Sequence, residues 1–183
     1  TILKDRLDKE KLNKIYELFE KPMVKILSEM ETNGIKVDKD YLKKLSKKFD
    51  SKIKKTEKEI YSLANKEFNI ASTKQLGDII YNELKIGNLK KTKKGSPATS
   101  ASILENLALK GHKFPSLVLD WRQLSKLKNT YTDALQDHIN SKTNRVHTSF
   151  LLAATNTGRL ASSDPNLQNI PIKTEDGREI RKA

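Results

Sequence analysis

The apolar residues of this chain recur at helical spacing, three, four or seven apart, through most of the first 140 positions. The first such stripe lies between residues 9 and 33 and consists of Leu12, Ile15, Leu18, Phe19, Met23, Ile26, Leu27 and Met30. Pro22 predicts a break into two helices near Lys21, because proline has no N–H for the helical ladder. Gly34 ends the segment, since glycine readily adopts the left-handed conformation found just after a helix.

A longer helix is predicted from Asp38, which can cap it, to about Lys66. Its apolar positions form one narrow seam, which consists of Leu42, Leu45, Phe49, Ile53, Ile60 and Leu63. Most of the intervening positions are lysine, nine of them between positions 39 and 58. A long helix with a single narrow seam indicates an antiparallel partner helix and a large solvated face.

Two shorter helices are predicted next. Ser72 or Thr73 caps the helix that begins in "STKQLGDII". Thr99 or Ser100 caps another, which Gly111 ends. Between the two, residues 85–97 carry three helix breakers and five lysines, and we expect a mobile loop there.

The last long helix starts at Pro115, and after residue 140 the pattern changes. The buried side of this helix consists of Leu117, Trp121, Leu124, Leu127, Tyr131, Leu135 and Ile139. "RVHTSFLLAA" is β-branched and aromatic with partial alternation, which predicts a strand or two. The chain therefore reads as a helical region to about residue 140 and the beginning of an α/β or α+β region. That second region is too short to close a core, so we expect a fragment of a longer protein.

The formal charge of +13 favours a polyanionic partner, with nucleic acid first and an anionic membrane surface second. A lysine-rich organism whose helices are simply solvated by lysine would produce the same charge. The absence of cysteine excludes a disulfide framework and a thiolate metal site. No apolar run approaches the roughly 20 residues that span a bilayer. "TILKDRLDKE" lacks the apolar stretch of a signal peptide, so we expect a cytoplasmic protein with no membrane partner.

The usual catalytic side chains are scarce. His112, His138 and His147 are scattered and have no ligand-like spacing, so a structural role is favoured for each. The sequence contains neither a phosphate-binding glycine loop nor a nucleophile signature. Asp164 precedes Pro165, where a turn role is favoured. No clustered carboxylates suit a two-metal phosphoryl-transfer site, and we predict no catalytic and no metal-binding residue in the chain.

Candidate phosphate contacts lie on the helices. Arg122 and Lys126, four apart in "WRQLSKLKNTYTD", are expected to stack on one exposed face, where a phosphate would relieve their repulsion. A solvated face explains them equally well. The free amides of a helix N-terminus also bind phosphate. The residues predicted to do so at two such starts, or in the lysine loop beside the second, are Ser72, Thr73, Lys74, Lys93, Lys94, Thr99 and Ser100.

The segment "TNTGRLASSDPNLQNIP", residues 155–171, offers the donors Arg159, Asn166, Gln168 and Asn169 on turns. In the minor groove every Watson–Crick pair presents acceptors at similar places. A guanidinium or amide that reaches them senses the geometry of a pair more than its sequence. For any short part of the segment, an ordinary asparagine-rich turn remains the simpler interpretation.

The whole string is far more specific. "TGRLASSDPNLQNIP" with "GREIRKA" resembles the segment of family A DNA polymerases just ahead of their first catalytic aspartate motif. The resemblance continues upstream in "RQLSKLKNTYTDAL", "RVHTSF", "STKQLGDII", "KKTKKGSPATS" and "EMETNGIKVD", in the order of the family. Ala161 stands where the family usually has serine, and we expect a minor effect.

The resemblance implies a mainly α fold with long antiparallel thumb helices and a short β-containing C-terminal segment that begins the palm of a multi-domain α+β parent. It implies a helical lead-in over residues 1–34, a thumb over 35–140 and the start of the palm over 141–183. Arg159 would lie in the minor groove at the primer terminus, beside the incoming nucleotide. Asn166, Gln168 and Asn169 would contact the nascent duplex, while Arg122 and Lys126 would hold primer-strand phosphates.

The family also implies partners: primer–template duplex DNA and, in the parent enzyme, an incoming dNTP. Two magnesium ions would be held by carboxylates outside this chain, so we expect the chain alone to be inactive. The parent would be a monomer in the bacterial cytoplasm, associated with the nucleoid, active in replication or repair. A non-catalytic helical module that grips duplex nucleic acid is the alternative. A coiled-coil-like interaction protein would fit residues 39–66 but leaves the tail unexplained.

Overall fold

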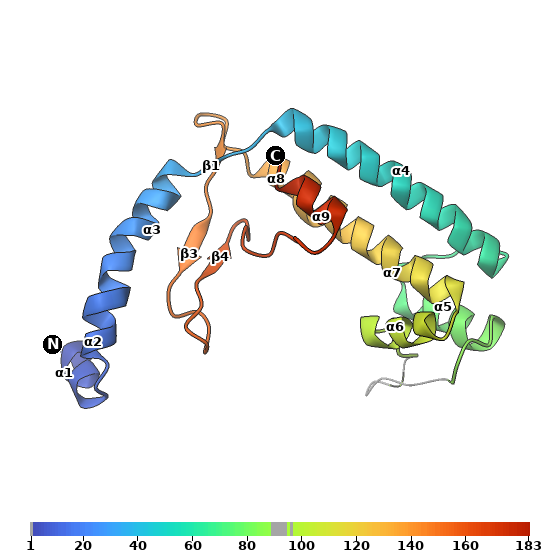
Figure 1. The fold of residues 1–183 in the computed structure, drawn as a ribbon, viewed down its shortest axis with the longest axis horizontal. Coiled ribbons are helices and arrows are strands. Elements are labelled where there is room, and N and C mark those ends of the chain that lie inside the picture. Colours follow the sequence, from blue (N-terminus) through green and yellow to red (C-terminus); the bar gives the residue numbers. More distant parts are fainter. Residues whose placement is uncertain (1, 89–94, 96) are drawn as a thin grey trace. The chain divides into compact units, whose positions relative to one another are not determined.

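A computed structural model of the protein describes residues 2–88, 95 and 97–183 (Figure 1). The chain is mostly helical with a few short antiparallel strands, which confirms the predicted fold class. It divides into two compact units, one formed by Lys43–Asp133 and the other by Thr1–Leu42 together with Ala134–Ala183. Most of the loop predicted over residues 85–97 lies outside the described residues, and so do Lys93 and Lys94.

The unit of Lys43–Asp133 is built on an antiparallel helix pair. Its elements are α4 (Lys39–Ala64, which starts in the other unit), α5 (Thr73–Asp78), the π-helix η2 (Ile79–Glu83), α6 (Ala101–Leu109), α7 (Lys113–Lys126) and the π-helix η3 (Leu127–Asp133). Ser46 Oγ donates to Asp133 Oδ1 at 2.6 Å, and Trp121 Nε1 donates to Glu57 Oε1 at 2.9 Å. These contacts align the start of α4 with the end of η3 (Figure 1), so the antiparallel partner is confirmed.

The seam of α4 is buried as predicted over most of its length. Leu42, Phe49 and Ile60 are fully buried. Near the end of the helix the prediction is wrong by one position, because Leu63 is 37% exposed and Ala64 is buried instead. An α-helix repeats every 3.6 residues, so an apolar face drifts around the helix relative to a strict seven-residue repeat.

The second unit joins the two ends of the sequence. Its elements are α1 (Ile2–Lys9), α2 (Asn13–Ile15), the π-helix η1 (Tyr16–Glu20), α3 (Lys21–Asn33), β1 (Ile35–Lys36), α8 (Ala134–Asp137), β2 (Arg145–Val146), β3 (Ser149–Leu151), β4 (Ala161–Ser163) and α9 (Glu175–Ile180). Strands β1 and β2 pair antiparallel with Ile35 opposite Val146. Strands β3 and β4 form a second antiparallel pair with Ser149 opposite Ser163.

The end of α3 is fastened to the strands by a histidine. His147 Nδ1 lies 2.8 Å from the Glu31 carbonyl oxygen, and its Nε2 lies 2.8 Å from Thr143 Oγ1. A Cβ at Gly34, where φ is +61°, would lie 2.7 Å from His147 Nδ1. Both the backbone conformation and this close approach therefore favour glycine. The structural role predicted for His147 is confirmed.

The prediction of a break into two helices at Pro22 is wrong, because the helix continues and only its type changes. The helix changes from π to α at Lys21, but the backbone stays helical, with φ and ψ of −66° and −50° at Glu20 and −64° and −43° at Lys21. Pro22 lies in the first turn of α3, where its fixed φ fits a helix and its missing N–H costs least. The segment also begins at Asn13 rather than at residue 9, after the separate helix α1.

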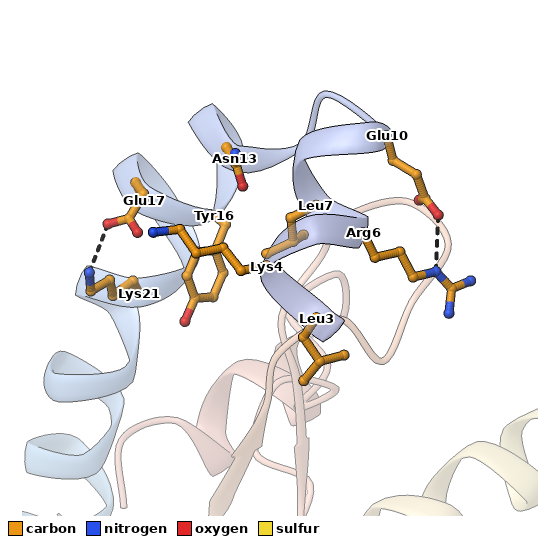
Figure 2. Close-up of a pocket in the computed structure, with 9 residues that line it drawn as sticks. All are labelled: Leu3, Lys4, Arg6, Leu7, Glu10, Asn13, Tyr16, Glu17 and Lys21. Atoms are coloured by element: carbon orange, nitrogen blue, oxygen red, sulfur yellow. Dashed lines mark hydrogen bonds and ion pairs between the residues drawn. The ribbon is translucent and has the colours of Figure 1, made fainter. Parts of the chain in front are cut away.

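The apolar stripe of residues 12–30 is largely uncovered. Leu27 is its one buried member, while Phe19 is 64% and Leu18 58% exposed. A hollow of about 820 Å³ lies between α1 and the helical segment that follows, lined in part by Leu3, Leu7 and Tyr16 (Figure 2). The other residues that line the hollow are polar or charged, so the hollow is of mixed character.

Candidate nucleic-acid interface

The side chain of Arg159 projects from the connection between β3 and β4. Its backbone is held by one threonine, since Arg159 N donates to Thr155 Oγ1 at 2.9 Å and that hydroxyl donates to the Arg159 carbonyl oxygen at 2.9 Å. Within the part of the chain that the structure describes, the guanidinium makes no hydrogen bond or ion pair, and the residue is exposed. Arg159 is thus a cation with an ordered backbone and an unused fork of donors.

The residues directly after β4 form a second ordered element, which we call the groove loop (residues 164–169). Asn166 Oδ1 accepts from Gln168 N at 3.1 Å and from Asn169 N at 3.3 Å. Ser162 Oγ accepts from Leu167 N at 3.2 Å. The side-chain oxygen of Asn166 is therefore used within the loop, and its amide nitrogen Nδ2 is the donor of the same side chain.

A buried threonine ties the groove loop to the strand region. Thr148 Oγ1 lies 3.0 Å from the Ser163 carbonyl oxygen and 2.7 Å from that of Pro165. Thr148 and Thr155 were not singled out from the sequence, although both are small polar residues close to the strand pair. The structure thus places Arg159 on the connection between β3 and β4, and the exposed residues Asn166, Gln168 and Asn169 on the loop after β4.

Of the two cations predicted to be exposed on α7, only one is exposed. Lys126 is exposed, but Arg122 is half-buried. Its Nη1 donates to the Thr99 carbonyl oxygen at 2.6 Å, and its Nη2 lies 3.4 Å from Thr99 Oγ1. Burial lowers the pKa of Arg122 from its ordinary value. The prediction that Arg122 shares a freely exposed face with Lys126 is therefore wrong.

This contact brings together two candidates that the sequence keeps apart. Arg122 on α7 reaches Thr99, which directly precedes Ser100 at the start of α6. Ser100 occupies the N-cap position without a side-chain cap hydrogen bond, and its Oγ lies 3.1 Å from Ser102 Oγ. One partly buried cation, two hydroxyls and a helix start thus adjoin one another.

The other predicted helix start differs. Ser72, rather than Thr73, is the cap of α5, because its side chain accepts from Gln75 N at 3.4 Å. Thr73 and Lys74 are exposed in the first turn. The Ser72 hydroxyl therefore has a structural role, which leaves Thr73 and Lys74 as the exposed polar groups of this site.

A metal-binding cluster and a membrane-spanning helix are both absent from the described residues. In the described part of the chain, no group of three or more histidine, aspartate or glutamate side chains could hold a metal ion. Among the described residues, no helix combines the length and apolar character that crossing a membrane requires. The candidate contact residues themselves offer positive charge, amides and hydroxyls.

Known proteins match this chain over its whole length. The sequence profile of DNA polymerase family A matches residues 39–183. DNA polymerase I of Rhizobium leguminosarum is 49% identical over 182 residues, 100% of this chain and 18% of that protein. The thermostable DNA polymerase I of Thermus thermophilus is 44% identical over 183 residues, 99% of this chain and 22% of that protein. The chain thus spans about a fifth of the length of these relatives.

A solved structure extends the likeness to three dimensions. The POL domain of Pol1 from M. smegmatis, in complex with DNA primer-template and dNTP, superposes with a TM-score of 0.89 and 39% sequence identity. The match covers 99% of this chain and 32% of that one. The profile match and the identities over the full length lead to one conclusion: the chain belongs to DNA polymerase family A.

Proposed function

We propose that this chain is the part of a DNA-directed DNA polymerase that binds the primer–template duplex during 5′–3′ synthesis. The observation that carries the proposal is the exposed donor set on an internally braced backbone: Arg159 held through Thr155, and Gln168 held through Asn166. Family membership supports it, and so does the bound primer-template of the matching Pol1 domain.

The strand connection and the groove loop would read the shape of the newest base pairs. Arg159 would donate to a minor-groove acceptor at the primer terminus, next to the incoming dNTP. Gln168, Asn169 and the Nδ2 of Asn166 would donate to acceptors further along the duplex. Purine N3 and pyrimidine O2 occupy similar places in all correct pairs, so these contacts report pairing geometry with little sequence preference.

The Lys43–Asp133 unit would hold the phosphates. Lys126, with Ser100 and the adjoining amides at the start of α6, would face the primer strand. Arg122 has five N–H donors, and Thr99 engages only some of them, so the rest can reach a phosphate. Thr73 and Lys74 offer a second contact, and phosphate contacts of this kind position a duplex without reading it.

The chemistry of synthesis would lie outside the described residues. Phosphoryl transfer in the parent would need divalent ions, magnesium by our proposal, and the described part of this chain offers no carboxylate cluster to hold them. No step of the reaction is therefore assigned to this chain. The parent would act as a monomer on the bacterial chromosome, in the cytoplasm, in replication or repair.

The salt dependence of duplex binding tests the proposal. If about five phosphates are neutralised, the log–log slope of affinity against salt is about −4.5, and affinity falls a few hundredfold between about 50 and 200 mM salt. Fluorescence anisotropy with two unrelated duplexes measures this slope and the sequence tolerance together.

A matched pair of lysine variants sharpens the test. Lys126→Gln should reduce the slope by about 0.9, the value for one phosphate contact. Lys4→Gln removes the same charge from α1, which has no proposed DNA contact, and should leave the slope unchanged. A flat salt response, or equal effects of the two variants, would show that the positive charge is compositional and not a duplex grip.

A further inference from the structure

We propose that α9 positions the groove loop, and that Arg181 and Gly177 are the residues through which it acts. The proposal rests on the minor-groove role proposed above for Gln168. It adds two positioning residues, neither of which touches DNA. They fix the position of Gln168, which would contact the minor groove.

Two arginines of α9 and its C-terminus hold the backbone that leaves the groove loop. Arg181 Nη2 donates to the Ile170 carbonyl oxygen at 3.2 Å. Arg178 Nη1 lies 3.3 Å from the Ile172 carbonyl oxygen and 3.2 Å from that of Lys173. The carbonyl group that Arg181 holds is only two residues beyond Gln168, so its position is transmitted directly to that side chain.

A glycine allows the helix to lie directly on this backbone. Gly177 is buried, and a Cβ there would lie 2.9 Å from both the Cβ and the carbonyl oxygen of Pro171. Thr174 caps α9 by accepting from Gly177 N at 3.2 Å, which fixes the helix start beside the same segment. Any side chain at position 177 must push α9 and Pro171 apart.

The helix is itself anchored, so it can act as a support. Tyr41 Oη donates to Glu179 Oε2 at 2.8 Å, and Asp38 N donates to the Ala183 carbonyl oxygen at 2.8 Å. The hydrogen bond to Glu179 raises the pKa of Tyr41, so the phenol remains protonated and keeps donating at neutral pH. Ile180 of α9 is buried, with 3% of its surface exposed, so the helix also has an apolar anchor. The groove loop is therefore braced upstream by Thr148 and downstream by α9.

Arg181→Ala in the parent polymerase tests the role, by single-turnover extension of matched and mismatched primers. A misplacement of about 1 Å can cost a hundredfold in rate, and for the loss of one of several supports we expect matched extension to slow by about tenfold. Mismatched extension and duplex affinity should change by less than about twofold, because Arg181 donates to the chain's own carbonyl group and not to a phosphate. Arg6→Ala, which removes an equal charge from α1, is the control and should change neither rate.

A double-mutant cycle separates positioning from general structural damage. Discrimination is here the ratio of the matched to the mismatched extension rate. If Arg181 acts through Gln168, then Arg181→Ala causes no further loss of discrimination in a Gln168→Ala background. Gly177→Ala should reproduce the phenotype without any change of charge, and Arg181→Lys, which keeps a donor and the charge, should restore part of the rate. Additive losses in the cycle, or a drop in duplex affinity without a change in discrimination, would overturn the proposal.

The same cycle distinguishes failure of the groove reading proposed for Gln168 from failure of the positioning role proposed for α9. If Gln168→Ala leaves discrimination unchanged, the proposed groove reading fails and the positioning role fails with it. If Gln168→Ala lowers discrimination but Arg181→Ala and Gly177→Ala do not, the groove reading stands and only the role of α9 is refuted.

Discussion

Replacing Arg159 by alanine in the parent polymerase removes one exposed guanidinium and leaves its backbone support in place. Both hydrogen bonds between Arg159 and Thr155 use the main chain of Arg159, and the described structure gives its side chain no partner to lose. We therefore expect the fold and the thermal midpoint to be unchanged. The effect of the substitution should lie in the contact with DNA.

The magnitude follows from the chemistry of that contact. A hydrogen bond to a charged group contributes about 1.5–3 kcal/mol net. If the bond forms fully only against a correctly shaped terminal pair, it lowers the barrier for extending a matched end more than for a mismatched one. At 1.36 kcal/mol for each factor of ten, Arg159→Ala should slow matched extension by about ten- to a hundredfold. Mismatched extension should slow much less, because its contact was already poor.

Single-turnover extension of matched and mismatched primers measures both rates. Thr155→Val keeps the guanidinium but removes the hydroxyl that orders the Arg159 backbone, and it should cause a smaller loss of the same kind. Arg6→Ala serves again as the charge control. Equal slowing of matched and mismatched ends by Arg159→Ala would refute the inspection of geometry assigned to this residue.

Two further substitutions test the Lys43–Asp133 unit. Arg122→Ala should weaken primer–template binding equally for matched and mismatched ends, because a phosphate contact carries no information about pairing; equilibrium titration of both duplexes checks this, and a selective loss for one of them would contradict it. For Asp133, burial by itself raises the pKa of the carboxyl group, but hydrogen bonds from Lys128 and Ser46 outweigh it and the net pKa is lowered. Its stabilisation is then present above the unfolded pKa, about 3.9, and is lost as the pH falls through the lower folded value. Since the carboxylate is 39% exposed, solvent limits this to about 1 kcal/mol or less. Asp133→Asn should lower the thermal midpoint by up to about 2–4 °C at pH 6. The difference from the unsubstituted chain should shrink as the pH falls and the carboxyl group becomes protonated, and a difference that stays constant would exclude the ionic origin.

Much of the helical structure could be predicted because its signals are local. Asp38 accepts from Tyr41 N at 2.9 Å as the predicted cap of α4, and α6 begins directly after Ser100 as expected. Helix caps, apolar periodicity and turn residues act over a few positions, so they are legible in the sequence alone. The family resemblance likewise rests on short continuous strings of residues, each of which is legible without the tertiary structure.

The limits of prediction lie where a local signal competes with a distant contact. Proline normally breaks a helix, yet the backbone stays helical from η1 into α3, where Pro22 lies in the first turn. Arg122 falls on a face that periodicity describes as solvated, yet Thr99 draws its guanidinium inward. The stripe of residues 12–30 has helical spacing, yet periodicity cannot say whether anything within the chain covers it.

The sequence by itself determined most of the long helices, the Asp38 cap, the positive charge and the family, because each depends on residues close together in the chain. Only the tertiary structure decided which segments meet: β1 with β2, Arg122 with Thr99, and α9 with the end of the groove loop. Each pairing joins a donor and an acceptor from different segments. No local sequence pattern indicates that these two segments will meet. Contacts between distant residues form on folding, when backbone N–H and C=O groups that lose contact with water find hydrogen-bond partners from other parts of the chain. The contact of Arg181 with the backbone after the groove loop is of this kind.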